Sequence, residues 1–267
     1  MPDTRPGYTV GLVSSYRDGA LTAAAARSLL GCCDRIYVAE GAVGENPDPG
    51  DAAALRKELR REPRIQINGV TADTDANKRT EMLDWARGYR PPEWIVVLDS
   101  DELLVHADQL PVQLWHMERL EANGGGVQMG CHLRLVELDG SVSAAMARVL
   151  RAPQIDRWLF SSYHLLLANG VPVALPNVQL LRADEPDYHV PANQKPPEAP
   201  MARRRPLHGE PHILHRSAYR DPARVAARLS QVEAVEVKQT VDPFAGVDRT
   251  AERGVPIWLP SQEGVLP

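Results

Sequence analysis

The sequence predicts an α/β fold with a mostly parallel central sheet, and three observations support this class. In the first hundred residues, β-branched apolar runs alternate with alanine- and arginine-rich stretches of helical pattern. Such alternation predicts βαβ crossovers. The middle of the chain instead has two strand patterns separated by Asp139-Gly140, a hairpin signal. A content of 43% hydrophobic and 24% charged residues over 267 positions is ordinary for a globular protein with a buried core.

The expected elements follow in order along the chain. We predict strands at 8–16, 35–40, 64–69 and 93–99, separated by helices at 20–33, 51–62 and 75–89. Further on we predict a helix at 107–123, antiparallel strands within 127–138 and 141–152, a proline-rich loop at 183–212 and a helix at 221–239. Asp221 as an N-cap and Pro222 at the first helical position support the last helix.

Charge and hydropathy exclude several classes of protein. The net charge of −5 argues against a protein that coats nucleic acid non-specifically. No apolar run reaches the roughly 18 residues that a membrane span needs, and the first residues lack the pattern of a signal peptide, so we expect a soluble cytoplasmic protein. The three cysteines, Cys32, Cys33 and Cys131, fit neither a disulfide framework nor a zinc site, and we expect buried free thiols.

An acidic cluster follows the strand pattern at 93–99. Three carboxylates, of Asp99, Asp101 and Glu102, surround Ser100 where the apolar run ends, and ligands of open α/β sheets bind at such strand ends. In extended backbone, Asp99 and Asp101 would face the same side, and their repulsion requires a neutralising positive charge. Mn²⁺ or Mg²⁺, completed by phosphate oxygens and water, would supply it. The alternative is a strand-end turn whose Asp and Ser side chains cap backbone amides.

The context of this cluster resembles the GT-A glycosyltransferases, in particular family 2. The resemblance covers a parallel α/β half, the apolar run that ends in "DSDE" and a mixed second half. It also covers the opening "VGLVSSYRDGALTAAAARSLLGCCDRIYVAEGAVG", in which Glu40-Gly41 stands where the family commonly has Asp-Asp-Gly-Ser. Two later segments match as well, "ANKRTEMLDWA" and "ILHRSAYRD".

The resemblance implies a site for a nucleoside-diphosphate sugar, with a UDP-sugar favoured. Asp99, Asp101 and the late histidine His215 would hold Mn²⁺ or Mg²⁺, and Glu102 would orient a ligand or the donor sugar. The residues that would contact the nucleotide are Ser14, Tyr16, Arg17, Glu40, Asn77, Lys78, Arg79, Ser100 and Arg216. The alternative for Lys78 and Arg79 is a solvated helix face.

The same resemblance predicts a catalytic base that the local sequence does not supply. The segment containing Arg148, Arg151 and His164 resembles one in which the family has a His-Glu pair, but here Leu165 follows the histidine. An inverting transferase needs a carboxylate base, for which Asp156, Glu185 and Asp187 are candidates; a retaining mechanism is the alternative.

The resemblance also implies the organisation of the chain. We expect one compact domain, with a nucleotide-sugar-binding half at 1–105, an acceptor-binding mixed half at 106–240 and a tail at 241–267. The acceptor would be a glycan, a lipid-linked sugar or a modified base of DNA. Arg203, Arg204 and Arg205 would contact its phosphate, or form a solvated charged loop.

Two other functions compete with the transferase. Haloacid-dehalogenase-like phosphatases also use Asp-x-Asp after an apolar strand, although there the motif follows the first strand and not the fourth. A non-catalytic protein that binds sugar nucleotides is the second alternative. A calcium loop of the EF-hand type is excluded by the absence of further acidic ligands and glycine at the required spacing.

Overall fold

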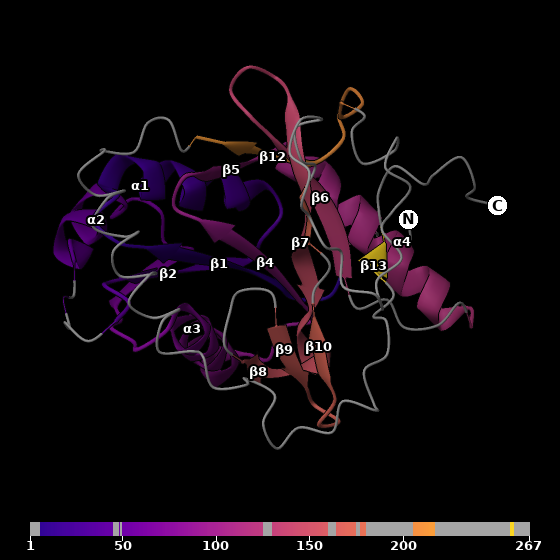
Figure 1. Ribbon diagram of the computed structural model, residues 1–267, viewed down its shortest axis with the longest axis horizontal. Coiled ribbons are helices and arrows are strands. Elements are labelled where there is room, and N and C mark those ends of the chain that lie inside the picture. The colour runs from indigo at the N-terminus through magenta and orange to yellow at the C-terminus, as the bar shows by residue number, and fades with distance from the viewer. Residues whose placement is uncertain are drawn as a thin grey trace, which may run out of the picture.

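A computed structural model describes residues 6–44, 48, 50–124, 130–159, 164–174, 177–179, 205–216 and 257–258. Within them, a large sheet runs through the molecule with helices on both faces (Figure 1). The strand order is β3-β2-β1-β4-β7-β6-β12-β5, and a small second sheet has the order β10-β9-β8. The α/β class predicted from the sequence is confirmed.

The first half of the sheet is parallel. Its strands are β1 (Thr9–Ser15), β2 (Arg35–Glu40), β3 (Ile65–Gly69) and β4 (Trp94–Asp99). The helices that connect them are α1 (Gly19–Ser28), α2 (Ala52–Glu58) and α3 (Asp75–Tyr89). Because β1 pairs with both β2 and β4, the carboxyl ends of these three strands meet at one edge of the sheet.

The hydrophobic core has two parts, one on each face of this sheet. Neighbouring residues of a strand point to opposite faces, so Val13 packs in the cluster that contains Leu29, while Leu12 packs with Leu83 of α3. Figure 1 shows α1 and α2 on one face and α3 on the other. Each apolar strand is therefore buried on both sides, as a parallel sheet requires.

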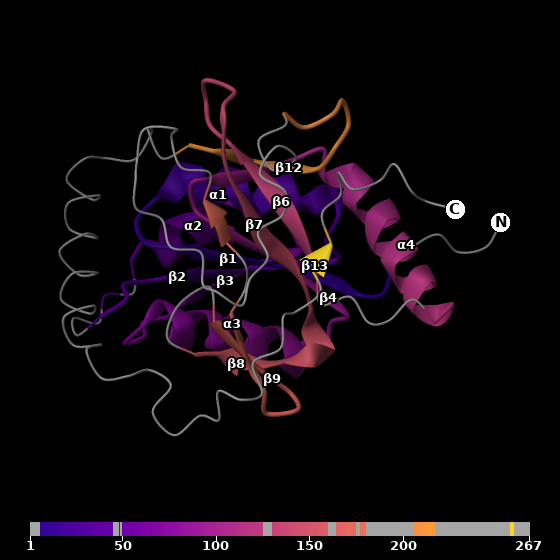
Figure 2. The same cartoon turned by 45° about the vertical axis from the view of Figure 1, so that its right-hand side comes forward.

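The second half of the sheet is mixed. Strands β6 (Gly130–Val136) and β7 (Val142–Arg151) form the predicted hairpin, and β7 pairs antiparallel with β4. Strand β12 (His212–His215) lies between β6 and β5 (Glu102–Val105), parallel to the first and antiparallel to the second. Figure 2 shows β12 crossing beside β6, with α4 (Leu110–Ala122) at the outer side. A mostly parallel half followed by a mixed half is the arrangement that the GT-A resemblance implied.

The remaining described strands are short. They are β8 (Ile155–Trp158), β9 (His164–Leu167), β10 (Pro172–Ala174), β11 (Asn177–Gln179) and β13 (Ile257–Trp258).

Most predicted boundaries agree with these elements, and the differences lie at some helix ends and in the short strands; the helix expected at 51–62, for example, ends at Glu58. The helix expected at 20–33 ends as α-helix at Ser28 and continues as a 3₁₀ turn, Leu29–Gly31. The helix expected at 107–123 begins with a 3₁₀ turn, Ala107–Gln109. Strand β5 was not predicted, because four residues are too few to establish a period.

Several predictions lie outside the described residues. They are the helix at 221–239, the proline-rich segment before residue 205 and most of the tail at 241–267. In the described part of the chain, no helix is both long and apolar enough to cross a membrane.

Candidate functional site

The candidate site lies at the carboxyl ends of β1, β2 and β4. The sheet register places Ser14 beside Asp99 and Ser15 beside Glu40. In an open α/β sheet, this edge is where ligands bind. The acidic cluster that follows β4 is therefore at the position predicted from the sequence.

Asp99, the last residue of β4, is held by two arginines. Its Oδ1 accepts a hydrogen bond from Arg79 Nη2 at 2.7 Å, and its Oδ2 accepts one from Arg148 Nη2 at 3.0 Å. The two arginine side chains are only 3% and 5% exposed. Positive charge from the protein thus neutralises Asp99, a function that we had expected a metal ion to perform.

These contacts extend into a larger group, the strand-end network, composed of Asp75, Arg79, Asp99, Arg148 and Glu102. Arg79 Nε donates to Asp75 Oδ2 at 2.7 Å, and Arg148 also donates to Glu102 Oε1. Burial alone would lower the pKa of Arg79, but Asp75 and Asp99 outweigh it and raise the pKa. Acids and arginines alternate through the network, so each buried charge faces an opposite one.

Glu102 is a structural member of this network in the described conformation. Glu102 is 2% exposed, and its Oε2 accepts a hydrogen bond from the backbone N–H of Asp99 at 2.9 Å. Burial raises the pKa of Glu102, while the Arg148 guanidinium opposes that rise. Glu102 is therefore engaged by protein groups, and its predicted role in orienting the donor sugar stays a prediction.

Ser100 and Asp101 form the turn between β4 and β5. Ser100 Oγ donates to Asp18 Oδ2 at 2.5 Å, and the backbone carbonyl of Asp101 accepts from the Arg216 N–H at 2.8 Å. The Asp101 side chain, 2% exposed, lies with its Oδ2 at 3.2 Å from His215 Nε2. Asp99 and Asp101 therefore have partners on different elements, because residues in a turn do not follow the alternation of a strand.

His215, at the end of β12, lies between two carboxylates. Its Nε2 faces Asp101, and its Nδ1 lies 3.1 Å from Glu137 Oε2. The hydrogen bond with Asp101 raises the pKa of His215 to about 9, against the opposing effect of burial, and Glu137 adds to the increase. The late histidine is therefore adjacent to the acidic cluster, as the sequence predicted, and its role as a metal ligand stays a prediction.

Glu40 is bound by protein groups in the interior, whereas the sequence predicts a direct contact between Glu40 and the nucleoside. Glu40 is fully buried, and its Oε1 accepts hydrogen bonds from the backbone N–H groups of Arg17 at 2.5 Å and Asp51 at 3.2 Å. Gly50, with φ +60°, lies against it so closely that a Cβ there would come within 2.2 Å of Oε1. In this conformation Glu40 holds two loops together and is covered by one of them.

The side chains of the loop after β1 lie nearer the surface. Tyr16 Oη donates to Asp48 Oδ2 at 2.8 Å, and Arg17 forms an ion pair with the same carboxylate at 2.8 Å. The hydrogen bond to Asp48 raises the pKa of Tyr16 and lowers that of Asp48. Arg17 is 49% exposed, so this pair is accessible to a ligand in a way that Glu40 is not.

The predicted diphosphate contacts at the start of α3 are divided between surface and interior. Lys78 is 1% exposed, and its Nζ donates to the carbonyls of Ser15 at 2.6 Å and Gly41 at 2.7 Å. It therefore ties the ends of β1 and β2 together and does not lie on a solvated face, and its expected contact with a ligand stays a prediction. Asn77 is exposed.

The other predicted residues occupy varied positions. Ser14 is half-buried, and Arg216 Nη2 donates to the Leu21 carbonyl of α1 at 3.1 Å. Asp156 is exposed on β8, where its carbonyl accepts from Arg87 at the far end of α3. Trp158, two residues further along β8, contacts Thr80 near the start of α3, and the role of Asp156 as a base stays a prediction. Arg205 is exposed, and Glu185, Asp187, Arg203 and Arg204 lie outside the described residues.

Two residues of the site were not predicted from the residue pattern. Arg148 was noted only through the family resemblance, and no local signal marks it as the partner of Asp99. Glu137 was not singled out, although its position just before the Asp139-Gly140 turn places it at a hairpin end. Arg148 becomes recognisable only when β7 pairs with β4, and Glu137 only when β12 pairs with β6.

The described residues contain no group of three or more His, Cys, Asp or Glu side chains that could hold a metal ion. Asp101 and His215 nevertheless fit part of such a site, since an oxygen and a nitrogen ligand 3.2 Å apart suit one divalent cation. Mg²⁺ and similar ions commonly take one or two protein ligands and complete their shell with phosphates and water.

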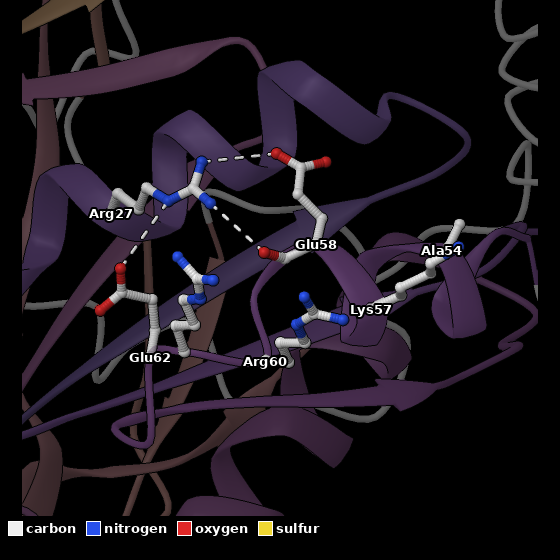
Figure 3. A pocket seen from close by; sticks show the side chains of 7 residues that line it. Arg27, Ala54, Lys57, Glu58, Arg60 and Glu62 are labelled. Atoms are coloured by element: carbon white, nitrogen blue, oxygen red, sulfur yellow. Dashed lines mark hydrogen bonds and ion pairs between the residues drawn. The ribbon is translucent and has the colours of Figure 1, made fainter.

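A separate hollow of about 660 Å³ lies on the surface, between α1 and α2. It is lined by Arg27, Ala54, Lys57, Glu58, Arg60, Arg61 and Glu62. Figure 3 shows Arg27 of α1 directed toward Glu58 and Glu62. We call it the α1–α2 hollow; none of its lining residues belongs to the strand-end site.

Comparisons with known proteins give the following findings. No protein-family model matches the sequence, and a search of curated proteins finds no match either. Similar solved structures include S. aureus TarS 1–349, with 9% identity and a TM-score of 0.39 over 58% of this chain and 52% of that chain. Another is the mannosyltransferase PcManGT from Pyrobaculum calidifontis in complex with GDP-Man and Mn²⁺, with 16% identity and a TM-score of 0.34 over 51% of this chain and 38% of that chain. This chain spans about half or less of the length of these proteins.

Proposed function

We propose that this protein is a metal-dependent glycosyltransferase that moves a sugar from a nucleoside-diphosphate sugar to an acceptor hydroxyl. The observation that carries the proposal is the Asp101–His215 pair, at 3.2 Å, beside the carboxyl end of β4. It joins a carboxylate and an imidazole from distant parts of the chain at the edge where an α/β sheet binds nucleotides.

Asp101 and His215 would hold Mn²⁺ or Mg²⁺ in this proposal. When bound, the cation would supply positive charge that stabilises the departing nucleoside diphosphate. Asp99 would contribute less directly, since both its oxygens already accept hydrogen bonds from arginines. Arg79 and Arg148 would hold the end of β4 in place and add to the positive potential there.

The nucleoside would contact the exposed loop residues rather than Glu40. Tyr16 and Arg17, linked through Asp48, are accessible polar groups beside the strand ends. Glu40 and Lys78 would support this loop from below, through the backbone groups that they bind. For the catalytic base we retain the predicted carboxylates Asp156, Glu185 and Asp187.

The phosphatase alternative is less well supported by these positions. In that mechanism the first aspartate of the motif attacks phosphorus, and here Asp99 is engaged by two buried arginines. A non-catalytic relative that binds sugar nucleotides would share the donor site, and release of free sugar from the donor separates it from a working transferase.

The decisive experiment is a titration of the purified chain with nucleoside-diphosphate sugars, with and without Mn²⁺. UDP-GlcNAc and GDP-Man, bound in structures similar to this chain, belong in the first panel. A donor at about a hundredfold excess over its Kd should stabilise the fold by about 2.7 kcal/mol, visible as a rise in Tm that requires the metal. Asp101→Asn should abolish that rise.

Asp84→Asn is the matched control, because Asp84 is 65% exposed on α3 and should leave donor binding unchanged. Failure of every donor to bind, under any metal condition, would refute the transferase proposal.

The acceptor requires a separate measurement. A glycan, a lipid-linked sugar and a modified DNA base remain the proposed classes. For DNA, replacement of Arg203, Arg204 and Arg205 by Ala should abolish salt-dependent retention on a DNA column. Equal retention of the variant and the parent chain would remove DNA contact through these arginines from the proposal.

A further inference from the structure

We propose that Glu137 is the positioning residue for His215 and holds the imidazole with Nε2 directed to the cation site beside Asp101. The inference rests on the proposed function, because it assumes a divalent cation at Asp101 and His215. Both oxygens of Glu137 lie close to His215 Nδ1, at 3.1 and 3.2 Å. The opposite ring nitrogen faces Asp101.

The fold places Glu137 there through backbone pairing. Strand β12 runs parallel to β6 with Ile213 opposite Leu135 and Leu214 opposite Val136, so continuing the register brings His215 beside Glu137. The turn after β6 is closed by the Glu137 N–H, which donates to the Ser141 carbonyl at 2.8 Å, and by the Gly140 N–H, which donates back to the Glu137 carbonyl. The carboxylate therefore extends from a backbone that is fixed on both sides.

The chemistry of imidazole gives this contact a consequence. A neutral imidazole has one N–H donor and one lone pair, and a metal ligand must present the lone pair. In the described structure the hydrogen bond between His215 and Asp101 places a proton on Nε2. A bound cation would displace that proton, and donation from Nδ1 to Glu137 would then leave the lone pair on Nε2, the nitrogen that faces Asp101. A carboxylate in this outer position fixes the tautomer and the ring orientation, and its loss typically weakens metal binding about 10- to 100-fold.

The exposure of the three side chains agrees with this arrangement. Asp101 is nearly buried at 2%, whereas His215 and Glu137 are 25% and 30% exposed. Among the described contacts, Glu137 and Asp101 hold the His215 ring from its two sides, so without Glu137 the ring would be held from the Asp101 side alone. We infer that the site would keep both ligands but lose their fixed orientation.

The test is a calorimetric titration of the metal-free full chain with Mn²⁺, without any donor. Glu137→Ala should weaken Mn²⁺ binding about 10- to 100-fold. Glu137→Gln should retain most of the affinity, because its amide oxygen still accepts from Nδ1–H. Glu81→Ala serves as the control, since Glu81 is exposed on α3. Unfolding curves in chelator identify any variant that loses its fold, and in that case the Gln variant carries the test.

The outcomes distinguish a failure of the positioning role of Glu137 from a failure of the proposed metal site at Asp101 and His215. If the parent chain binds no Mn²⁺, the metal site itself is absent and the inference is overturned with it. If the parent chain binds Mn²⁺ and Glu137→Ala binds equally well, the metal site stands and the positioning role is overturned. If Glu137→Gln binds Mn²⁺ normally but cannot transfer sugar, Glu137 acts on the reaction directly, which also overturns the positioning role.

Discussion

The strand-end network and the α1–α2 hollow use the same residue types in opposite surroundings. In the network, Arg79 and Arg148 are 3% and 5% exposed and bind carboxylates at the end of β4. In the hollow, Arg27 and Glu58 are 43% and 42% exposed and are 3.4 Å apart. Buried charges cost much when a partner is lost, whereas exposed pairs contribute little. Arg79 and Arg148 should therefore contribute more to the free energy of unfolding than Arg27.

The largest effect should come from Arg148→Met. The substitution leaves Glu102 and one oxygen of Asp99 without their buried partner, and such a loss costs about 3–5 kcal/mol of unfolding free energy. Urea denaturation at neutral pH measures it, with Arg27→Met as the exposed counterpart. The double substitution of Arg148→Met and Glu102→Leu should recover part of the loss, and equal effects of the two single arginine substitutions would contradict the comparison.

The next effect concerns pH and the half-buried His215. Its pKa is raised to about 9, so the folded state holds a proton that the unfolded state, with a pKa of about 6.5, releases earlier. This contribution is fully present below about pH 6.5 and is lost as the pH rises through 9, by up to about 3 kcal/mol. Urea denaturation in chelator across this range should show it in the parent chain and not in His215→Gln. Parallel stability curves for the two proteins would refute it.

The hydrogen bond that caps α3 involves no charge, and its contribution to the free energy of unfolding should lie between those of the buried and the exposed ion pairs. Thr74 caps α3, and its Oγ1 accepts from the Asn77 N–H at 3.1 Å. Thr74→Ala should lower the unfolding free energy by about 1 kcal/mol, and Thr74→Ser should restore most of it, as measured by thermal unfolding. A loss in both variants would mean that the threonine methyl, and not the cap, stabilises this end of the helix.

The smallest effect should be the coupling between Arg27 and Glu58. A double-mutant cycle with Arg27→Ala and Glu58→Ala should give a coupling of about 0–1 kcal/mol that decreases with added salt. Both side chains are more than two-fifths exposed, so water screens the pair. A coupling as large as the loss in Arg148→Met would show that the hollow is a stability element in its own right.

The elements that the sequence predicted best are those with strong local signals. Helix α3 runs over the predicted 75–89, because a capping threonine precedes it and extended residues follow Tyr89. Strand β2 matches the predicted 35–40, since its apolar run is bounded on both sides. Strand β5 was missed because its four residues carry no period. The short strands β8 and β9, which pair antiparallel, also have four residues each and were missed for the same reason.

The sequence indicated where the candidate site lies but not which side chains pair with its carboxylates. The carboxylates at the end of β4 and the late histidine were recognisable in the sequence, and β12 brings His215 opposite Glu102. The need for positive charge near Asp99 also followed from repulsion between carboxylates. Its source did not, because Arg79 comes from α3 and Arg148 from β7.

The sequence by itself determined the α/β class, the succession of the main strands along the chain and the acidic end of one strand. Hydrophobic periodicity and turn residues are local properties of the chain. Only the tertiary structure decided that arginines neutralise Asp99, that Glu40 and Lys78 are buried supports, and that Glu137 meets His215. Each of these depends on contacts between distant segments: the packing of α3 for Lys78 and Arg79, and sheet pairing for Arg148 and Glu137. Hydrogen-bonded register, and not local pattern, sets which side chains meet.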